Sequence, residues 1–283
     1  RGSEIQSTIP HCTRADMYRL IWFQHVHKAA GSSIVNQAIA NGEVFFPNHK
    51  NGNPHSPDGE LIPLWDFNQN ELKEFVDQCE EDGITFVATE WGAPMYDVLE
   101  ADSRVSLITC LRDPFSRLIS NFNYDYYYGF TRSKSLSEYL TEELKINLDN
   151  FLVRVFSRKF NVRRHELDNS DVLEASTNIR RFNLVLVIER PGDLTKHLCE
   201  ALGWTPHKVD THSTFGNLRI FISLILGLRF SSAWNYSLKR KISNTEIERS
   251  KFFKSSQLEL AFYNFLTKEN VRGNLHPLYQ HFD

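Results

Sequence analysis

One short stretch of the chain combines two histidines, a lysine, a glycine and two serines: residues 25–33, His-Val-His-Lys-Ala-Ala-Gly-Ser-Ser. A lysine ammonium and the free backbone N–H groups at the start of a helix both attract phosphate or sulfate. The loop of nucleotide hydrolases reads GxxxxGK followed by Ser or Thr, whereas here Lys28 precedes Gly31. The stretch therefore predicts an anion-binding loop of a different kind.

A second stretch with suitable chemistry is residues 111–120, Leu-Arg-Asp-Pro-Phe-Ser-Arg-Leu-Ile-Ser. Arg112 offers a planar fork of donors that suits a phosphate, and Ser116 and Ser120 are one turn apart on the same helix face. One anion site with a lysine and another with an arginine and serine suit a nucleotide that carries phosphates at both ends of its ribose.

The elements around both stretches indicate how they are positioned. Residues 20–23 form a short apolar run and predict a buried strand, and residues 32–42 predict a helix that ends at Gly42. Residues 105–111 predict another strand, after which Asp113 as N-cap and Pro114 as first residue begin a helix that reaches about residue 127. Each candidate anion site thus lies between a strand and a helix.

Further strands are expected at residues 84–89 and 184–188. Buried strands that alternate with helices predict an α/β fold of the P-loop-like, three-layer kind, with a central parallel sheet flanked by helices. Ligands of such folds gather at the carboxyl ends of the strands. The residues expected at those ends are 25–33, Glu90-Trp91, 112–120 and Glu189-Arg190.

The rest of the chain is expected to form one domain, residues 19–283, behind an N-terminal arm of residues 1–18. Helices are expected at residues 71–81 (capped by Asn70), 135–145, 150–160, 170–181, 192–202 and 245–268, with a loop at 47–59. The apolar run 220–228 is too short to cross a bilayer. It predicts a buried or partner-facing helix, with interfacial membrane contact as the alternative.

Composition narrows the class of protein. The 283 residues are 41% hydrophobic and 24% charged, and the net charge of −3 provides no overall positive field for a nucleic acid. The four cysteines form no CxxC pair, so neither a zinc site nor another metal site is expected. The sequence favours a globular domain that binds a small anionic ligand.

Both stretches resemble the nucleotide-binding motifs of sulfotransferases that use 3′-phosphoadenosine 5′-phosphosulfate (PAPS). Residues 25–33 resemble the 5′-phosphosulfate loop, in which Lys-Thr-Gly-Gly-Thr is usual, and residues 111–120 resemble the Leu-Arg-Asp-Pro motif that binds the 3′-phosphate. The chain resembles in particular the membrane-anchored carbohydrate sulfotransferases of the heparan-sulfate 6-O and 2-O types, over roughly residues 21–266. The order and separation of the two motifs carry the resemblance.

The resemblance implies roles for matching residues. Lys28 would contact the bridging oxygen and the 5′-phosphosulfate, and Arg112 and Ser120 would hold the 3′-phosphate. The remaining donors of the loop would be Ala29, Ala30, Gly31, Ser32 and Ser33. The 6-O enzymes carry a catalytic histidine at the end of the strand before the 3′-phosphate motif, where this chain has Glu90. Alanines also stand where Thr-Gly is usual.

The expected reaction is in-line sulfuryl transfer from PAPS to an acceptor hydroxyl, which leaves 3′,5′-ADP and requires no metal. Glu90 is the first candidate for the base that removes the hydroxyl proton, with His27 or His55 as alternatives, while His25 is expected to fix the loop. Lys28 and the loop amides would stabilise the charge that builds on the transferred group. A P-loop-type phosphoryl-transfer enzyme and a non-catalytic nucleotide- or glycan-binding module are the competing functions.

The acceptor is expected to be a glycan, with a small hydroxylated metabolite as the alternative and no nucleic acid as partner. A polyanionic glycan would need a local basic trough, for which the available clusters are Arg154, Arg158, Lys159, Arg163 and Arg164, and Lys239-Arg240-Lys241. The tyrosines of residues 124–128 could line an acceptor site. The resemblance implies a type II membrane protein of the Golgi lumen whose anchor would lie outside this sequence, and a cytoplasmic protein is the alternative.

Overall fold

The computed structural model describes residues 18–142, 149–163, 166–190, 192–209, 217–238 and 246–271. Residues 1–17, nearly all of the expected N-terminal arm, lie outside this set. Tyr18, the first described residue, donates a hydrogen bond from its hydroxyl to the carbonyl oxygen of Ile84, at 2.5 Å. The described chain therefore begins in contact with the segment that leads into the sheet.

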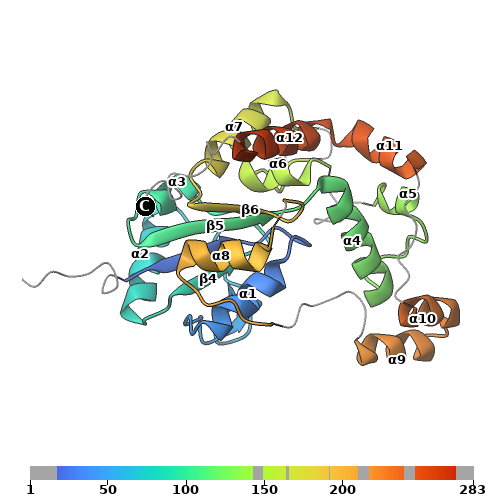
Figure 1. The fold of residues 1–283 in the computed structure, drawn as a ribbon, viewed down its shortest axis with the longest axis horizontal. Helices are drawn as coiled ribbons and strands as arrows, with labels where there is room; N and C mark the ends of the chain where they lie inside the picture. Colours follow the sequence, from blue (N-terminus) through green and yellow to red (C-terminus); the bar gives the residue numbers. More distant parts are fainter. Residues whose placement is uncertain are drawn as a thin grey trace, which may run out of the picture.

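A four-stranded parallel sheet forms the centre of the molecule (Figure 1). Its strands, in spatial order, are β4 (Phe86–Thr89), β1 (Leu20–Gln24), β5 (Val105–Leu111) and β6 (Leu184–Val187). The strands are almost entirely buried, as expected of parallel strands that are covered on both faces. The predicted α/β fold with a central parallel sheet flanked by helices is confirmed.

Helices cover both faces of this sheet, and alternate residues of β1 point to opposite sides. Ile21 and Phe23 pack with α1 (Gly31–Ala40) and α8 (Leu194–Leu202). Leu20 and Trp22 pack on the other side, in the larger core cluster. The helices that contribute to this cluster are α2 (Gln69–Glu81), α3 (Tyr96–Glu100), α6 (Phe151–Phe156), α7 (Asn169–Ile179) and α12 (Gln257–Val271).

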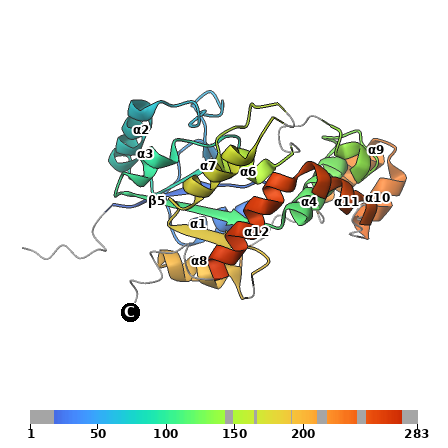
Figure 2. The same ribbon diagram turned by 90° about the horizontal axis from the view of Figure 1, so that it is seen from above.

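The remaining helices gather at one end of the molecule, away from α2 and α3 (Figures 1 and 2). They are α4 (Pro114–Tyr128), α5 (Leu136–Tyr139), α9 (Leu218–Leu226), α10 (Phe230–Ser237) and α11 (Glu246–Ser255). Aromatic side chains of α4 join the group: Phe115 and Phe122 pack with α5 and α11, and Tyr127 packs with α9 and α10. α4 therefore links the sheet to this group.

Several predicted boundaries shift in the structure. Asn68, rather than Asn70, caps α2, because its side chain accepts from the Asn70 and Glu71 amides while the Glu71 carboxylate accepts from the Asn68 amide. The expected loop at 47–59 contains a small antiparallel ribbon of β2 (His49–Lys50) and β3 (Asn53–Pro54). The expected final helix at 245–268 is two helices, α11 and α12, that meet at Ser256.

A buried carboxylate that the sequence did not single out ties α12 to α6. Glu259 is fully buried and accepts hydrogen bonds from the backbone N–H groups of Phe151 and Leu152, at 3.1 and 3.2 Å. Its Oε1 also lies 4.0 Å from Nε of the buried Arg117, whose guanidinium covers the Phe151 ring. The carboxylate therefore serves the start of α6 and a buried cation together.

Replacing Glu259 with alanine is expected to lower the free energy of unfolding by about 3–5 kcal/mol, because two backbone donors and a buried guanidinium lose a partner. Urea denaturation would measure the change. Glu74→Ala, at an exposed position of α2, is the matched control and should change the free energy by less than about 0.5 kcal/mol. Equal losses in the two variants would show that Glu259 has no special structural role.

Candidate functional site

The carboxyl ends of β1 and β5 lie side by side and bring the two predicted anion elements together. Gln24 pairs with Thr109 across these strands, and the Thr109 hydroxyl donates to the Gln24 carbonyl at 2.8 Å. Just beyond them, Nη1 of Arg112 donates to the carbonyl oxygen of Lys28 at 3.3 Å. The lysine loop and the arginine that begins the second element are thus in direct contact.

The loop between β1 and α1 has an unusual backbone. Lys28 and Ala30 adopt left-handed conformations, with φ of 64° and 61°, a region that non-glycine residues seldom occupy. Ala30 is the N-cap of α1, provides no side-chain hydrogen bond, and is followed by no acidic residue in the first turn. Gly31, Ser32 and Ser33 form that turn. The positive end of the helix dipole is therefore not neutralised by the chain itself at this point.

The Lys28 ammonium lies over the ring of Tyr124 on α4, 4.1 Å from the ring centroid. Burial lowers the pKa of this amine to about 8, and nearby Arg112 lowers it too, while Asp125 and Glu90 act in the opposite direction. A partly desolvated ammonium that lies over an aromatic face can exchange that contact for an anion.

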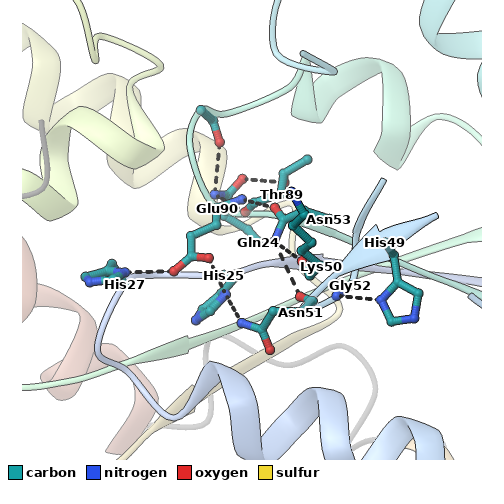
Figure 3. Close-up of polar contacts among 11 residues, drawn as sticks. Gln24, His25, His27, His49, Lys50, Asn51, Gly52, Asn53, Thr89 and Glu90 are labelled. Carbon is teal, nitrogen blue, oxygen red and sulfur yellow. Dashed lines mark hydrogen bonds and ion pairs between the residues drawn. The ribbon is translucent and has the colours of Figure 1, made fainter. Parts of the chain in front are cut away.

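His27 and Glu90 form the central pair of the site (Figure 3). Nδ1 of His27 lies 2.7 Å from Oε1 of Glu90, which directly follows β4. Burial raises the pKa of Glu90, but His25, the hydrogen bond and charge of His27, and Lys28 outweigh it and leave the pKa below its usual value. The carboxylate is therefore ionised and can accept from Nδ1–H; in the neutral tautomer that donates from Nδ1, the lone pair lies on Nε2. Nε2 is buried and has no hydrogen-bond partner among the described residues.

The antiparallel ribbon of β2 and β3 also contacts Glu90, through the Glu90 backbone. The side-chain oxygen of the buried Asn53 on β3 accepts from the Glu90 backbone N–H at 2.9 Å. Asn51, in the turn between β2 and β3, places its amide nitrogen 3.4 Å from Nδ1 of His25 (Figure 3). These two asparagines were not predicted as site residues, because they lie in a polar segment that reads as an ordinary loop. His55 from the same segment bonds to the Asn53 carbonyl rather than to Glu90.

The His25 ring packs against the loop between β1 and α1, as predicted. Its buried ring stacks on Phe23, and its Nδ1 lies 3.4 Å from Oε2 of Glu90. Burial lowers the pKa of His25, so the ring is neutral near pH 7. A Cβ atom added to Gly31 would lie 1.7 Å from Nε2 of this ring. The close approach of the ring to the start of α1 therefore requires glycine at this position.

Gly31→Ala is expected to displace the His25 ring or the first turn of α1 and to lower the free energy of unfolding by about 1–3 kcal/mol. Chemical denaturation would measure the loss. The same substitution in a His25→Ala background should cost much less, because the clashing ring is gone. Full additivity of the two substitutions would contradict this account of the contact.

The predicted 3′-phosphate element begins as expected and has an additional support. Asp113 caps α4 by accepting from the Ser116 backbone N–H at 2.8 Å, with Pro114 as the first helical residue. Glu189 accepts from the Asp113 backbone N–H and from the Tyr263 hydroxyl, at 2.9 Å each. Glu189 and Tyr263 thus brace the start of α4 from β6 and α12.

The two residues predicted to hold the 3′-phosphate, Arg112 and Ser120, differ in their position and contacts. Nε of Arg112 lies 4.0 Å from Oε1 of Glu189, beyond hydrogen-bond distance, and has no hydrogen-bond partner among the described residues. Ser120 lies partly exposed on α4, one turn after Ser116. Arg112 thus lies just before α4 and Ser120 in its second turn, and the Nε of Arg112 retains unused donor capacity.

Aromatic rings border the site on the α4 side. The His27 ring lies 6.1 Å from that of Tyr124 and 6.2 Å from that of Trp91, measured between ring centroids. Tyr124 stacks with Tyr128 at 4.2 Å, and Phe130 lies 5.8 Å from Tyr124. Trp91 and Phe130 are exposed. Of the predicted tyrosines, Tyr124 therefore lies beside His27 and Lys28, and Tyr128 stacks behind it.

Arg154, the first residue of the expected basic trough, is not available for binding a ligand. Arg154 is fully buried, with Nη2 donating to Asp149 at 2.8 Å and Nη1 to the Val162 carbonyl at 2.6 Å. Lys159 is paired with Asp171. The guanidinium of Arg154 therefore holds a turn together and cannot face a ligand. Arg164 and Lys239-Arg240-Lys241 lie outside the described residues.

Among the described residues, no group of three His, Cys, Asp or Glu side chains could hold a metal ion. The same part of the chain contains no helix whose length and hydropathy would suffice to cross a bilayer. In comparisons with known proteins, no protein-family model matches the chain, and no curated protein matches it significantly.

Proposed function

We propose that this protein is a PAPS-dependent sulfotransferase with a P-loop-like fold, which transfers the sulfuryl group to an acceptor hydroxyl. The observation that carries the proposal is the meeting of three groups at the ends of neighbouring strands: the His27–Glu90 pair, the Lys28 ammonium, and Arg112. The first suits removal of a hydroxyl proton, and the two cations suit a donor with two anionic ends.

The residues present fit the donor nucleotide. The first turn of α1 has no side-chain cap and no acidic residue, and Ala29 and Ala30 place no bulky side chain before it. Lys28 would meet the phosphosulfate with these amides, while Arg112 and Ser120 would meet the 3′-phosphate. The contact between Arg112 and the Lys28 carbonyl keeps both ends of the site close together.

PAPS supplies a sulfuryl group on an activated anhydride oxygen. The bond from sulfur to that bridging oxygen breaks as a bond to the acceptor oxygen forms, and the electron pair stays on 3′,5′-ADP. Lys28 and the α1 amides stabilise the negative charge that collects on the leaving phosphate. This role requires the protonated amine, so the rate of transfer depends on the protonation state of Lys28.

His27 is a better base than Glu90 in this geometry, which changes the order predicted from the sequence. Glu90 turns Oε1 to His27 and Oε2 to His25, so both carboxylate oxygens are already occupied. Nε2 of His27 is the atom with a free lone pair. Glu90 fixes the tautomer and stabilises the imidazolium that forms when Nε2 takes the acceptor proton, in the manner of the acidic residue of a Ser-His-Asp triad.

The acceptor must approach past the aromatic rings, because Nε2 of His27 is covered. Tyr124 and Trp91 border His27, so one of these rings must turn aside for a hydroxyl to reach it. When the phosphosulfate draws the Lys28 ammonium away, Tyr124 loses the cation that holds its face. Exposed Trp91 and Phe130 offer ring faces suited to a pyranose or another ring.

The direct test is release of 3′,5′-ADP from PAPS without added magnesium, together with sulfation of a panel of neutral glycans, anionic glycans and small alcohols. Release that depends on an acceptor supports the proposal. Phosphoryl transfer from ATP with magnesium, but none from PAPS, would favour a kinase-type enzyme. Binding of 3′,5′-ADP with no transfer to any acceptor would favour a non-catalytic module.

Binding of 3′,5′-ADP is expected to weaken as the pH rises through about 8, the value at which the Lys28 amine loses its proton. Because the anion prefers the ammonium form, the dissociation constant should rise by up to about tenfold per pH unit above that value. Calorimetric titrations between neutral and alkaline pH would measure it. Lys28→Arg keeps its charge throughout and should give a nearly constant dissociation constant; the same slope in both proteins would contradict the assignment.

A further inference from the structure

Helices α9 and α10 present an apolar face to solvent. On α9, the exposed residues Leu218, Ile222, Ile225 and Leu226 recur at the spacing of one helix face, and on α10 Phe230 and Trp234 do the same and lead to Leu238. Leu228 connects the two rows. These eight residues, which we call the outer apolar face, are all exposed, with Leu226 at 78% and Trp234 at 65%.

The opposite sides of both helices account for their packing on the rest of the protein. Leu224 of α9 and Ala233 and Tyr236 of α10 are buried with Tyr127 of α4. The Tyr236 hydroxyl also accepts from the Asn217 backbone N–H at 3.0 Å, which ties the end of α10 to the start of α9. The two helices are therefore held in place without the outer apolar face. Residues 220–228 were predicted as a buried or partner-facing helix; since only Leu224 of α9 is buried, the helix is not a core helix of this chain, and the partner-facing and membrane alternatives stay predictions.

The sequence of this segment carries charge of one sign. Between Asp210 and Glu246 the sequence contains no acidic residue and five cations, Arg219, Arg229, Lys239, Arg240 and Lys241. Arg219 is exposed in the first turn of α9, and Arg229 lies between the helices over the Tyr126 ring. An apolar face with tryptophan and phenylalanine, flanked by cations, is the pattern of helices that lie in the headgroup region of an anionic membrane.

We infer that the outer apolar face of α9 and α10 docks on the surface of an anionic lipid bilayer, with both helices in the plane of the interface. This inference does not depend on the proposed catalytic function. A second copy of the chain fits less well, because the described residues 217–238 contain two arginines and no carboxylate, so a two-fold interface on this face would set like charge against like charge. Anionic headgroups provide the opposite charge.

The test is co-sedimentation of the full chain with phosphatidylcholine vesicles, with and without about one third phosphatidylserine. Leu226→Glu and Leu228→Glu together should lower the partition coefficient for the anionic vesicles at least about tenfold, because two leucines that would enter the bilayer are lost and two negative charges gained. The matched control is Leu173→Glu with Ile247→Glu, which changes the same charge at residues that are 70% and 69% exposed on other helices. Arg219→Gln should weaken binding about fivefold.

The expected result is binding of the wild type that requires phosphatidylserine, weakens in high salt, and survives in the control pair. Circular dichroism should show that both double variants remain folded. Failure of the wild type to bind anionic vesicles would overturn the inference, as would equal losses in the two pairs. Sedimentation velocity that shows a dimer abolished by the Leu226 and Leu228 changes, without vesicle binding, would assign the face to a second copy instead.

Discussion

Replacing His27 with glutamine is expected to lower the rate of sulfuryl transfer by about 10²–10⁴-fold, the range that a positioned general base supplies. The glutamine can still bond to Glu90 but cannot take a proton from the acceptor. The dissociation constant of 3′,5′-ADP should change little, because His27 faces the acceptor side of the loop. Single-turnover kinetics with saturating PAPS would isolate the chemical step.

Glu90→Gln separates the two candidate bases. If Glu90 orients His27, the variant should lose rate because the amide no longer stabilises the imidazolium, and transfer should remain detectable. His55→Gln is the control histidine, since its Nδ1 is engaged with the Asn53 carbonyl, away from Glu90. A His27→Gln variant with the wild-type rate would return the role of base to Glu90.

Replacing Lys28 with alanine is expected to lower kcat/KM for PAPS by about 10²–10³-fold, as loss of a group that stabilises charge in the transition state does elsewhere. Unlike His27→Gln, this change should also weaken binding of 3′,5′-ADP. The overall fold should be retained, because the Lys28 side chain is partly exposed and lies over the Tyr124 ring rather than in the core. Initial rates across PAPS concentrations would measure the effect.

Lys50→Ala is the matched control for this prediction, since Lys50 is an exposed lysine on the neighbouring ribbon. Its removal should leave kcat/KM within about twofold of the wild-type value, as surface charges act weakly at physiological salt. An equal loss in both variants would indicate general electrostatic attraction of the donor rather than contact with Lys28.

The elements that position the loop could be predicted because their signals are local. Residues 105–111 form a mostly apolar run, interrupted by Ser106 and Thr109, and become β5 with the predicted bounds. Asp113 and Pro114 are a cap and a first residue whose preferences act within one turn, and α4 begins there. The two anion elements lie where a strand ends and a helix begins. Their positions could therefore be predicted together with those strands and helices.

The pairing of His27 with Glu90 could not be predicted, although each was a candidate by itself. The two residues are 63 positions apart and meet only because β4 pairs with β1. The order of strands in a sheet follows from packing of the whole chain. It cannot be read from the local sequence around His27 or around Glu90. The same reason hides Asn53, whose amide reaches Glu90 from the small ribbon.

The outer apolar face shows a second limit of sequence-based prediction, which concerns burial. The run at residues 220–228 is as apolar as a buried helix, and hydrophobicity alone does not distinguish the core from an exposed binding surface. Burial of Arg154 is the converse case, because a charged residue in a basic cluster reads as surface until its partners are known. Both corrections depend on tertiary contacts.

The bond network from Tyr263 through Glu189 to Asp113 has a consequence for efforts to shorten this protein. The helix that carries Tyr263 lies more than 70 positions after β6, yet its hydroxyl and the Asp113 amide share one carboxylate oxygen. A fragment that stops after the last strand would keep every catalytic candidate and lose this brace. A minimal functional version must therefore extend through α12.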